Sequence, residues 1–114
     1  MLPREKPGFK HVYFGYPIVI RPDAPFTRKE FVSFLESRGI ETRPIAAGNI
    51  VEQPVAKLMK YRVAGSLTNS KIIMRNGVFL GMHHLIGDAQ REYIVSCIEE
   101  FMDKYAVKRS AKHL

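Results

Sequence analysis

The feature that most constrains the fold is a run of apolar residues at helical spacing near the C-terminal end of the chain. These residues recur every three or four positions: Ile94, Cys97, Ile98, Phe101, Met102 and Tyr105. The spacing predicts a helix over residues 89–105 with one apolar face. Asp88 is a suitable cap for its start. Such a face has to pack against another layer of structure, so the rest of the chain must supply one.

A second helix, predicted over residues 28–38, is part of that layer. Thr27 and Glu30 have the spacing of a capping box, which marks a helix start, and Gly39 marks the end. Phe34 and Leu35 lie on its apolar stripe. We expect both to be buried with Ile94, Ile98 and Phe101 of the final helix.

Three strands are predicted. Residues 11–20 alternate, which places one set of apolar side chains on a single face: Val12, Phe14, Tyr16, Ile18 and Ile20. Residues 40–45 form a short strand whose Pro44 indicates an edge position. Residues 78–82 form a third strand between two glycines. Shorter helices are predicted over 54–60, with Val55, Leu58 and Met59 facing inward, and over 67–76. The order of elements predicts an α+β domain, with a short sheet backed by helices on one face.

The chain of 114 residues is long enough for one domain. Residues 1–10 contain two prolines and several charges, and they predict a linker. The domain is expected over residues 11–107, and residues 108–114 are expected to be a tail.

Several classes of function are disfavoured. The net charge is +7, but the basic residues are spread along the chain and concentrated near its ends, and there is no RNA-binding motif. We therefore expect no nucleic-acid partner. Membrane association is not expected either, because no apolar run approaches the roughly 18–20 residues that a span needs. With no signal peptide at the start and a single cysteine, Cys97, the chain is expected to be cytoplasmic. Cys97 is expected to be a packed core residue.

Two places could carry chemistry. Arg43 precedes a turn of small residues that ends at Asn49, so it is either an anion clamp or a surface arginine beside a structural turn. His83 and His84 follow the third strand. Adjacent histidines point in different directions and have no ligand at metal spacing nearby, which favours a loop beside a cleft or subunit interface over a metal site. No nucleophile elbow or phosphate-binding glycine loop is present.

Several segments resemble, in order, the C-terminal domain of the DegT/DnrJ-type sugar aminotransferases, which use pyridoxal phosphate (PLP). The matching segments are Phe14-Gly15-Tyr16-Pro17, residues 35–44 (LESRGIETRP), Ala47-Gly48-Asn49, Gln53-Pro54, Leu67-Thr68-Asn69 and residues 77–84 (GVFLGMHH). Together they cover about residues 12–102. The Gly-Tyr-Pro and Ala-Gly-Asn forms look closest to the branch that contains nucleotide-sugar 3-dehydrases.

The resemblance implies a small, mainly antiparallel sheet with helices on one face, like the small C-terminal domain of fold-type I PLP-dependent transferases. It implies an enzyme that aminates or 3-dehydrates a nucleotide-linked 4-keto-6-deoxysugar in lipopolysaccharide or deoxysugar biosynthesis, with PLP bound mainly by an N-terminal domain absent here. A homodimer is implied for the full-length form. By motif position, the implied substrate-binding residues are Arg43, Asn49, His83 and His84.

None of the lysines here lies in a motif that matches the Schiff-base position. No catalytic residue or metal ligand is therefore assigned, the chain alone is expected to be inactive, and it is not expected to bind PLP specifically. The alternative is a non-enzymatic protein-interaction module, in which the surface that would meet the missing domain binds another partner.

Overall fold

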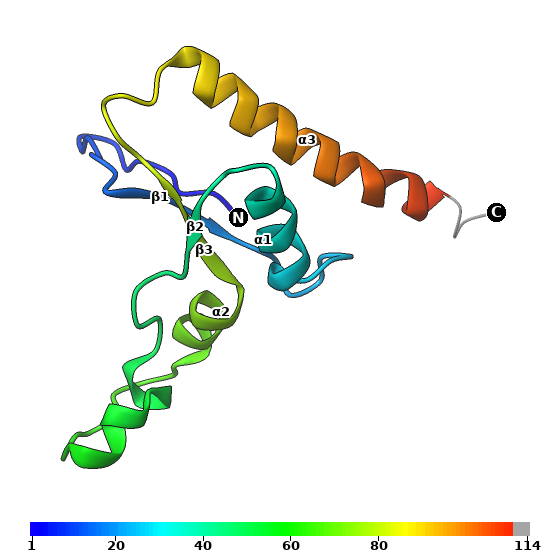
Figure 1. The fold of residues 1–114 in the computed structure, drawn as a ribbon. Helices are drawn as coiled ribbons and strands as arrows, with labels where there is room; N and C mark the ends of the chain where they lie inside the picture. The colour runs from blue at the N-terminus through cyan, green and yellow to red at the C-terminus, as the bar shows by residue number, and fades with distance from the viewer. Residues whose placement is uncertain (111–114) are drawn as a thin grey trace.

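The structure is a computed structural model, and it describes residues 1–110. The elements along the chain are β1 (Gly15–Val19), α1 (Arg28–Ser37), β2 (Thr42–Arg43), the 3₁₀ turns η1 (Ile50–Glu52) and η2 (Pro54–Leu58), α2 (Thr68–Asn76), β3 (Gly77–Gly81) and α3 (Asp88–Ser110). Figure 1 shows their arrangement. The predicted tail begins inside α3, and residues 111–114 lie outside the described residues. In the described part of the chain, no helix combines the length and apolar character needed to cross a bilayer.

The three strands form one antiparallel sheet in the order β1-β3-β2. β3 is therefore central and the other two strands are edges. Pro17 lies in β1 and Pro44 directly follows β2, in agreement with the edge position predicted from Pro44, because proline cannot donate to a neighbouring strand. The pairing places Pro17 opposite Phe79 and Thr42 opposite Leu80. The predicted α+β fold with a small antiparallel sheet is confirmed.

The core lies between one face of the sheet and the helices α1 and α3, which cover it (Figure 1). Its buried residues are Ile18, Ile20, Phe31, Leu35, Ile40, Val78, Leu80, Cys97 and Phe101. Of the side chains expected to be buried, Leu35 and Phe101 are buried, whereas Phe34, Ile94 and Ile98 are partly buried against them. Cys97 is a packed core residue, as predicted.

The capping box at the start of α1 is confirmed. The Thr27 hydroxyl accepts a hydrogen bond from the backbone N–H of Glu30, and the Glu30 carboxylate accepts one from the backbone N–H of Thr27 at 2.6 Å. These bonds fix where α1 begins, and so they fix the register of its buried residues against the sheet.

α2 passes into β3 without a connecting residue, because α2 ends at Asn76 and β3 begins at Gly77. The Gly77 backbone N–H donates to the Ile73 carbonyl, which closes the helix. Asn76 holds the end of β1 at the same point: its carbonyl accepts from the Ile20 N–H, and its side-chain amide donates to the Ile20 carbonyl, both at 3.0 Å. The helix, the central strand and the edge strand are thus joined at one place.

The first strand is shorter than the predicted 11–20, because only Gly15–Val19 pair with β3. β1 begins at Gly15, whose partner Gly81 is the last residue of β3. Because β3 offers no further partner, the chain before Gly15 leaves the sheet, and the Val12 and Phe14 side chains are exposed, Phe14 at 95%. Likewise only Thr42 and Arg43 of the predicted strand 40–45 pair with β3.

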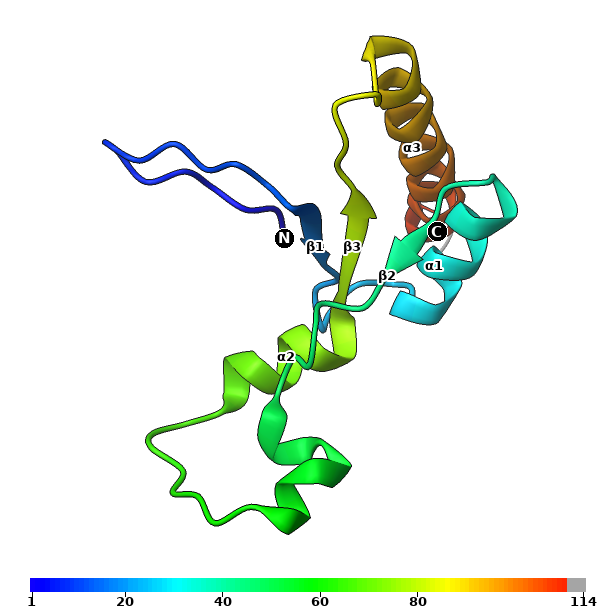
Figure 2. The ribbon, with the colours of Figure 1, turned by 60° about the vertical axis from the view of Figure 1, so that its left-hand side comes forward.

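The prediction that Val55, Leu58 and Met59 face inward is also wrong. All three are exposed, Leu58 at 87%. They belong to residues 46–67, which we call the lobe, and Figure 2 shows this green segment extending away from the sheet below α2. The lobe lies too far from the core for its apolar residues to be buried there, so they remain a surface.

Candidate functional site

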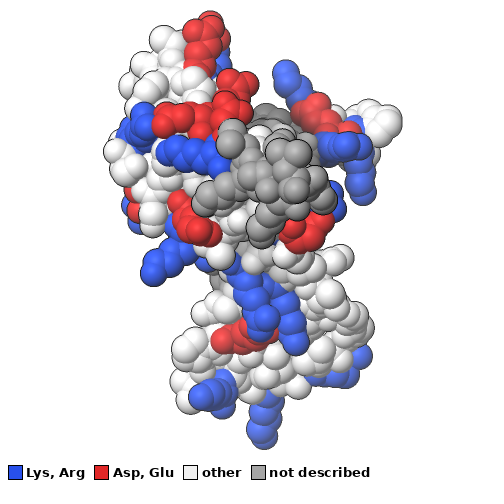
Figure 3. Space-filling view, turned by 90° about the vertical axis from the view of Figure 1, so that its right-hand side faces the viewer, with Lys and Arg blue, Asp and Glu red and all other residues white. Residues whose placement is uncertain are grey.

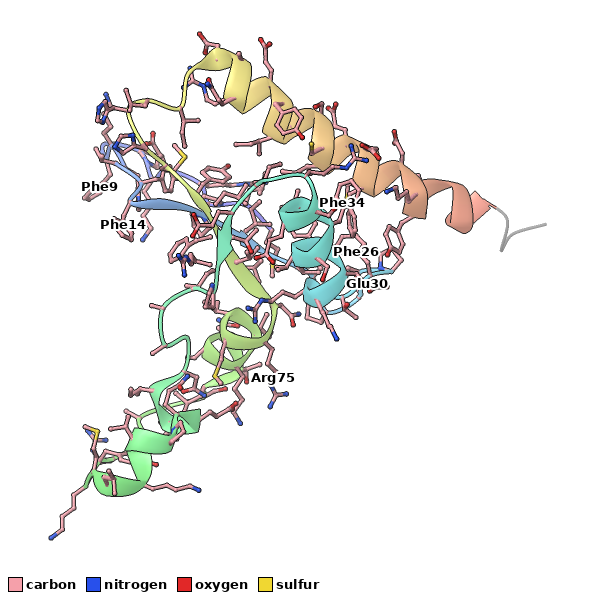
Figure 4. All side chains as sticks on the ribbon, in the orientation of Figure 1. Phe9, Phe14, Phe26, Glu30, Phe34 and Arg75 are labelled. Carbon is pink, nitrogen blue, oxygen red and sulfur yellow. The ribbon has the colours of Figure 1, made fainter. Side chains whose placement is uncertain are left out.

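A cleft of about 940 Å³ lies on the sheet face opposite the core. We call it the apolar cleft, since most of its lining side chains are apolar; they include Phe14, Pro17, Ile45, Ile72, Ile73 and Phe79. The sheet register explains the composition. Pro17 and Phe79 are direct cross-strand partners, and they alternate with Ile18 and Val78, which face the core. In Figure 4 the exposed Phe9 and Phe14 lie away from α1 and α3, whereas Phe26 and Phe34 lie between those helices.

Arg43 lies on the same face of the sheet as this cleft, although it is not one of the described residues that line it. It pairs with Phe79 across β2 and β3, and direct partners in an antiparallel pair project to the same face. The preceding residue, Thr42, is buried on the core side and donates to the Glu36 carboxylate at 2.8 Å. The Arg43 side chain is 76% exposed, with one ion pair, to Glu41 at 2.5 Å. A guanidinium has five donor hydrogens, so Arg43 keeps donors available for a ligand.

Asn49, in contrast, is buried, with only 3% of its surface exposed. Its amide nitrogen donates to the Glu52 carboxylate at 3.3 Å, and its backbone carbonyl accepts from the Glu52 N–H. Glu52 also forms ion pairs with Lys71 and Arg75 of α2. Asn49 therefore helps to hold the base of the lobe against α2.

His83 and His84 lie on the loop after β3, and both are exposed. Their rings are 4.0 Å apart. His83 Nδ1 accepts a hydrogen bond from the Leu85 N–H at 3.2 Å. Among the described residues, no group of three or more His, Cys, Asp or Glu side chains is arranged to hold a metal.

The four predicted residues do not converge. Asn49 lies against α2, which leads into the start of β3, whereas the histidine pair follows the end of β3. The five residues of β3 separate these positions by roughly 17 Å. Arg43 lies between them on the edge strand. None of the four lines the apolar cleft, as far as the described residues define it.

Gly48, in the turn before Asn49, lies so close to α2 that no side chain fits at this position. Gly48 has φ +62, and a Cβ built on it would lie 2.6 Å from both Cα and Cβ of Met74. Gly48→Ala should therefore move the lobe away from α2 and lower the free energy of unfolding by about 2–4 kcal/mol, combining left-handed strain with the clash. Gly39→Ala is the matched control, since Gly39 has φ +74 but no atom within 4 Å of its Cβ position. It should cost only the strain, about 1–2 kcal/mol. Equal losses in urea denaturation of the two variants would contradict the close contact.

The sequence predicted a partly apolar surface for the missing domain but not its location in this cleft, and it did not indicate the role of Glu52. The available signal was an excess of apolar residues: β1 and its approach carry large side chains on both faces, more than one core layer can bury. Exposed apolar patches of this kind mark surfaces that bind other groups.

Comparisons with known proteins agree with the fold. The DegT/DnrJ/EryC1/StrS aminotransferase family matches residues 1–99. The chain is 40% identical over 104 residues to dTDP-4-dehydro-2,6-dideoxy-D-glucose 3-dehydratase of Saccharopolyspora spinosa, which covers 91% of this chain and 22% of that protein. It is 38% identical to lipopolysaccharide biosynthesis protein RfbH of Salmonella typhimurium, covering 78% of this chain and 20% of that one. The chain thus spans about a fifth of the length of these relatives.

Among solved structures, the chain resembles E. coli GDP-4-keto-6-deoxy-D-mannose-3-dehydratase with bound hydrated PLP, with a TM-score of 0.66 and 33% identity over 73% of this chain and 22% of that one. A GDP-4-keto-6-deoxymannose-3-dehydratase with a trapped PLP-glutamate geminal diamine gives a TM-score of 0.64, also at 33% identity, over 74% of this chain and 22% of that one.

The residues described here do not fit a complete PLP site. No lysine is found among the residues that line the apolar cleft. Arg43, the candidate on the same sheet face, is a cation that cannot serve as a base, and the two histidines lie beyond the far end of β3. No catalytic step through PLP can therefore be derived from this chain alone.

The family match over residues 1–99, the 40% identity to a 3-dehydratase and the shared fold all describe the same segment. Each of them covers most of this chain and only a minor part of the longer relatives. The chain belongs to the DegT/DnrJ/EryC1/StrS aminotransferase family.

Proposed function

We propose that this chain is the C-terminal domain of a PLP-dependent enzyme that acts on a nucleotide-linked 4-keto-6-deoxysugar. The observation that carries the proposal is the 40% identity to a nucleotide-sugar 3-dehydratase over 91% of this chain. In this proposal the cofactor, which supplies the carbanion chemistry, is held by a second, N-terminal part of the protein, and the functional form is a homodimer. The reaction is amination or 3-dehydration in deoxysugar or lipopolysaccharide biosynthesis.

The apolar cleft is the surface on which the cofactor-bearing part docks. Its floor is formed by the sheet and its sides by α2 and the chain before β1, and it exposes large side chains such as Phe14 and Phe79. A water-exposed apolar surface of this size is unfavourable, and a second domain that covers it removes that cost. Arg43, on the same face of the sheet, would then lie near the junction of the two parts, where ligands commonly bind.

The candidate residues take different roles in this arrangement. Arg43 binds substrate oxygens, because its planar guanidinium can hold a phosphate or a pair of sugar oxygens with two parallel hydrogen bonds. Asn49 is a positioning residue that fixes the lobe through Glu52. His83 and His84 contact substrate only from the loop at the other end of β3.

The test is Arg43→Lys in a family-length protein that carries this C-terminal sequence. Lysine keeps the charge but not the forked geometry, so KM for the sugar nucleotide should rise about tenfold while kcat changes little. Arg91→Lys is the matched control, since Arg91 is also exposed and paired with a carboxylate, Asp88, and should leave KM within about twofold. Equal KM values for wild type and Arg43→Lys would return Arg43 to a surface role.

A protein-interaction module is the second candidate, and the lobe favours it. Its exposed apolar side chains are Ile50, Val55, Leu58, Met59, Tyr61 and Val63. The coding sequence upstream of Met1 discriminates between the two functions. An in-frame domain with a Schiff-base lysine, or the histidine that replaces it, supports the enzyme, whereas a stop codon followed by a ribosome-binding site supports the module.

A further inference from the structure

A second cleft, of about 540 Å³, lies between the turn before α1, the first residues of α1 and the end of α2. We call it the basic cleft, because four of its lining residues are cations: Arg21, Arg28, Lys29 and Arg75. Figure 4 shows Arg75 extending from α2 on the side of the molecule that carries Glu30 and the start of α1. Figure 3 looks onto this side and shows blue Lys and Arg side chains in a band between the upper body and the lower lobe. Glu30 is the acidic residue among the described lining residues.

The acidic groups near the cleft are already engaged. The Glu30 carboxylate accepts hydrogen bonds from the Thr27 backbone N–H at 2.6 Å and from the Thr27 hydroxyl at 2.7 Å, so it is turned toward its own helix cap. Asp23 binds Arg21 with two hydrogen bonds, at 2.9 and 3.1 Å. Arg21 is thus largely neutralised, and Arg28, Lys29 and Arg75 supply the remaining positive charge of the cleft, against the one negative charge of Glu30.

Among the described residues, none of these three cations is hydrogen-bonded to a carboxylate. The Arg28 Nε is buried and has no hydrogen-bond partner, which is costly for a donor of a charged group. In the described part of the chain, neither Arg28 nor Lys29 forms an ion pair. The nearest carboxylate to Arg75 is that of Glu52, at 3.7 Å, which is beyond hydrogen-bond length and is shared with Lys71 at 3.8 Å.

We propose that the basic cleft binds a phosphate-bearing anion of the size of a diphosphate. Arg28 and Arg75 come from different elements and present guanidinium groups, which bind phosphate oxygens in pairs. Arg28 and Lys29 are also the first two residues of α1, so their backbone N–H groups have no acceptor within the helix. An oxyanion bound by the Arg28 guanidinium would give this side chain an acceptor, which no described residue supplies to Nε.

The anion site goes beyond the proposed function and does not depend on it. The basic cleft contains none of the four candidate substrate residues, and it shares only Arg21 and Pro22 with the apolar cleft among the described lining residues. If Arg43→Lys did not change KM, the proposed role of Arg43 would fail but the proposed anion site would be unaffected. If the chain did not bind the anion, the anion site would fail but the proposed enzyme function would be unaffected.

The test is a titration of the purified 114-residue chain with inorganic pyrophosphate at low ionic strength, followed by calorimetry and by ¹⁵N-edited NMR of the arginine Nε–H signals. We expect one-to-one saturation and a shift of the Arg28 Nε–H signal. Arg28→Gln and Arg75→Gln should each weaken binding about five- to tenfold, as the loss of one charge-assisted contact implies. Arg62→Gln, which removes the same charge from an exposed position on the lobe, should change the Kd by less than twofold.

A second arm of the experiment identifies the source of the phosphate. Tighter binding of dTDP than of pyrophosphate would assign the site to a nucleotide, and equal binding would assign it to a free diphosphate. The proposal is overturned if pyrophosphate does not saturate, or if Arg62→Gln weakens binding as much as Arg28→Gln. If a cleft variant does not fold, the wild-type NMR titration still decides, because shifts spread over all arginines would mean general charge attraction and no site.

Discussion

Replacing Phe101 with alanine should lower the free energy of unfolding by roughly 3–5 kcal/mol. Phe101 is 3% exposed, and it is the ring at which the two core helices meet. Its centroid lies 4.9–5.3 Å from those of Phe26, Phe31, Phe34 and Tyr105. Alanine removes all four ring contacts and leaves a cavity that helices held by several other residues cannot close. Domains of this size have a total stability of about 5–15 kcal/mol, so the loss is a large part of the whole.

Chemical denaturation monitored by circular dichroism measures this loss. Met102→Ala is the control: Met102 is the next residue of α3 and is 45% exposed, so its truncation should cost less than about 1 kcal/mol. Phe101→Leu keeps most of the volume and should fold with a loss of about 1–1.5 kcal/mol, which protects the test if the alanine variant does not fold. Similar midpoints for Phe101→Ala and Met102→Ala would mean that α3 is not packed as described.

The second large effect concerns activity. The 114-residue chain by itself should turn over a 4-keto sugar nucleotide at least about 10⁶-fold more slowly than a family-length enzyme, because most of the rate enhancement depends on a positioned cofactor. PLP chemistry needs an amine or base beside the cofactor and a charged partner for its ring nitrogen. The apolar cleft and its rim offer no such lysine among the described residues. An ordinary lysine, with a pKa near 10.4, is almost fully protonated at neutral pH and reacts only weakly with an aldehyde.

Absorbance titration of the purified chain with PLP, followed by an assay with a 4-keto sugar nucleotide, measures this directly. The E. coli GDP-4-keto-6-deoxy-D-mannose-3-dehydratase, whose structure contains PLP, is the positive control. A weak, non-saturating signal is the expected result for this chain. A saturable one-to-one adduct with turnover would show that the chain is a complete enzyme and that the assignment as a C-terminal domain is wrong.

The parts of the fold that the sequence predicted are those set by local rules. The Thr27–Glu30 capping box and the helix predicted from apolar spacing near the C-terminal end depend on residues a few positions apart, and both are present. Met102, which was placed on the apolar face of that helix, is 45% exposed. The errors arose where the partner of a segment decides the outcome. Val12 and Phe14 continue the alternation of β1, but β3 ends at Gly81 and leaves them without a strand to pair with. Alternation alone carries no information about the length of a neighbouring strand.

The candidate site was harder to predict for the same reason. The distances between Arg43, Asn49 and the histidine pair depend on the direction in which β2 and β3 run. Because the two strands are antiparallel, the residues after β2 and the residues after β3 leave the sheet at opposite ends. The burial of Asn49 depends on the contact between the lobe and α2. That contact joins residues far apart in the sequence, such as Gln53 and Met74, which are 21 positions apart. The small residues of the turn that ends at Asn49 indicated that its backbone closely approaches another group, but they did not indicate that this group is Met74 of α2.

The direct passage from α2 into β3 has a mechanical consequence. The backbone carbonyl and the side-chain amide of Asn76 are both hydrogen-bonded to the backbone of Ile20, and no loop residue separates α2 from β3. The junction therefore has no free segment of backbone that could act as a hinge. We expect a ligand or partner that displaces the lobe to move α2 and β3 together, and the loop of His83 follows the other end of β3. A displacement of the lobe would thus reach the loop of His83 along β3, the strand whose Val78 and Leu80 pack in the core.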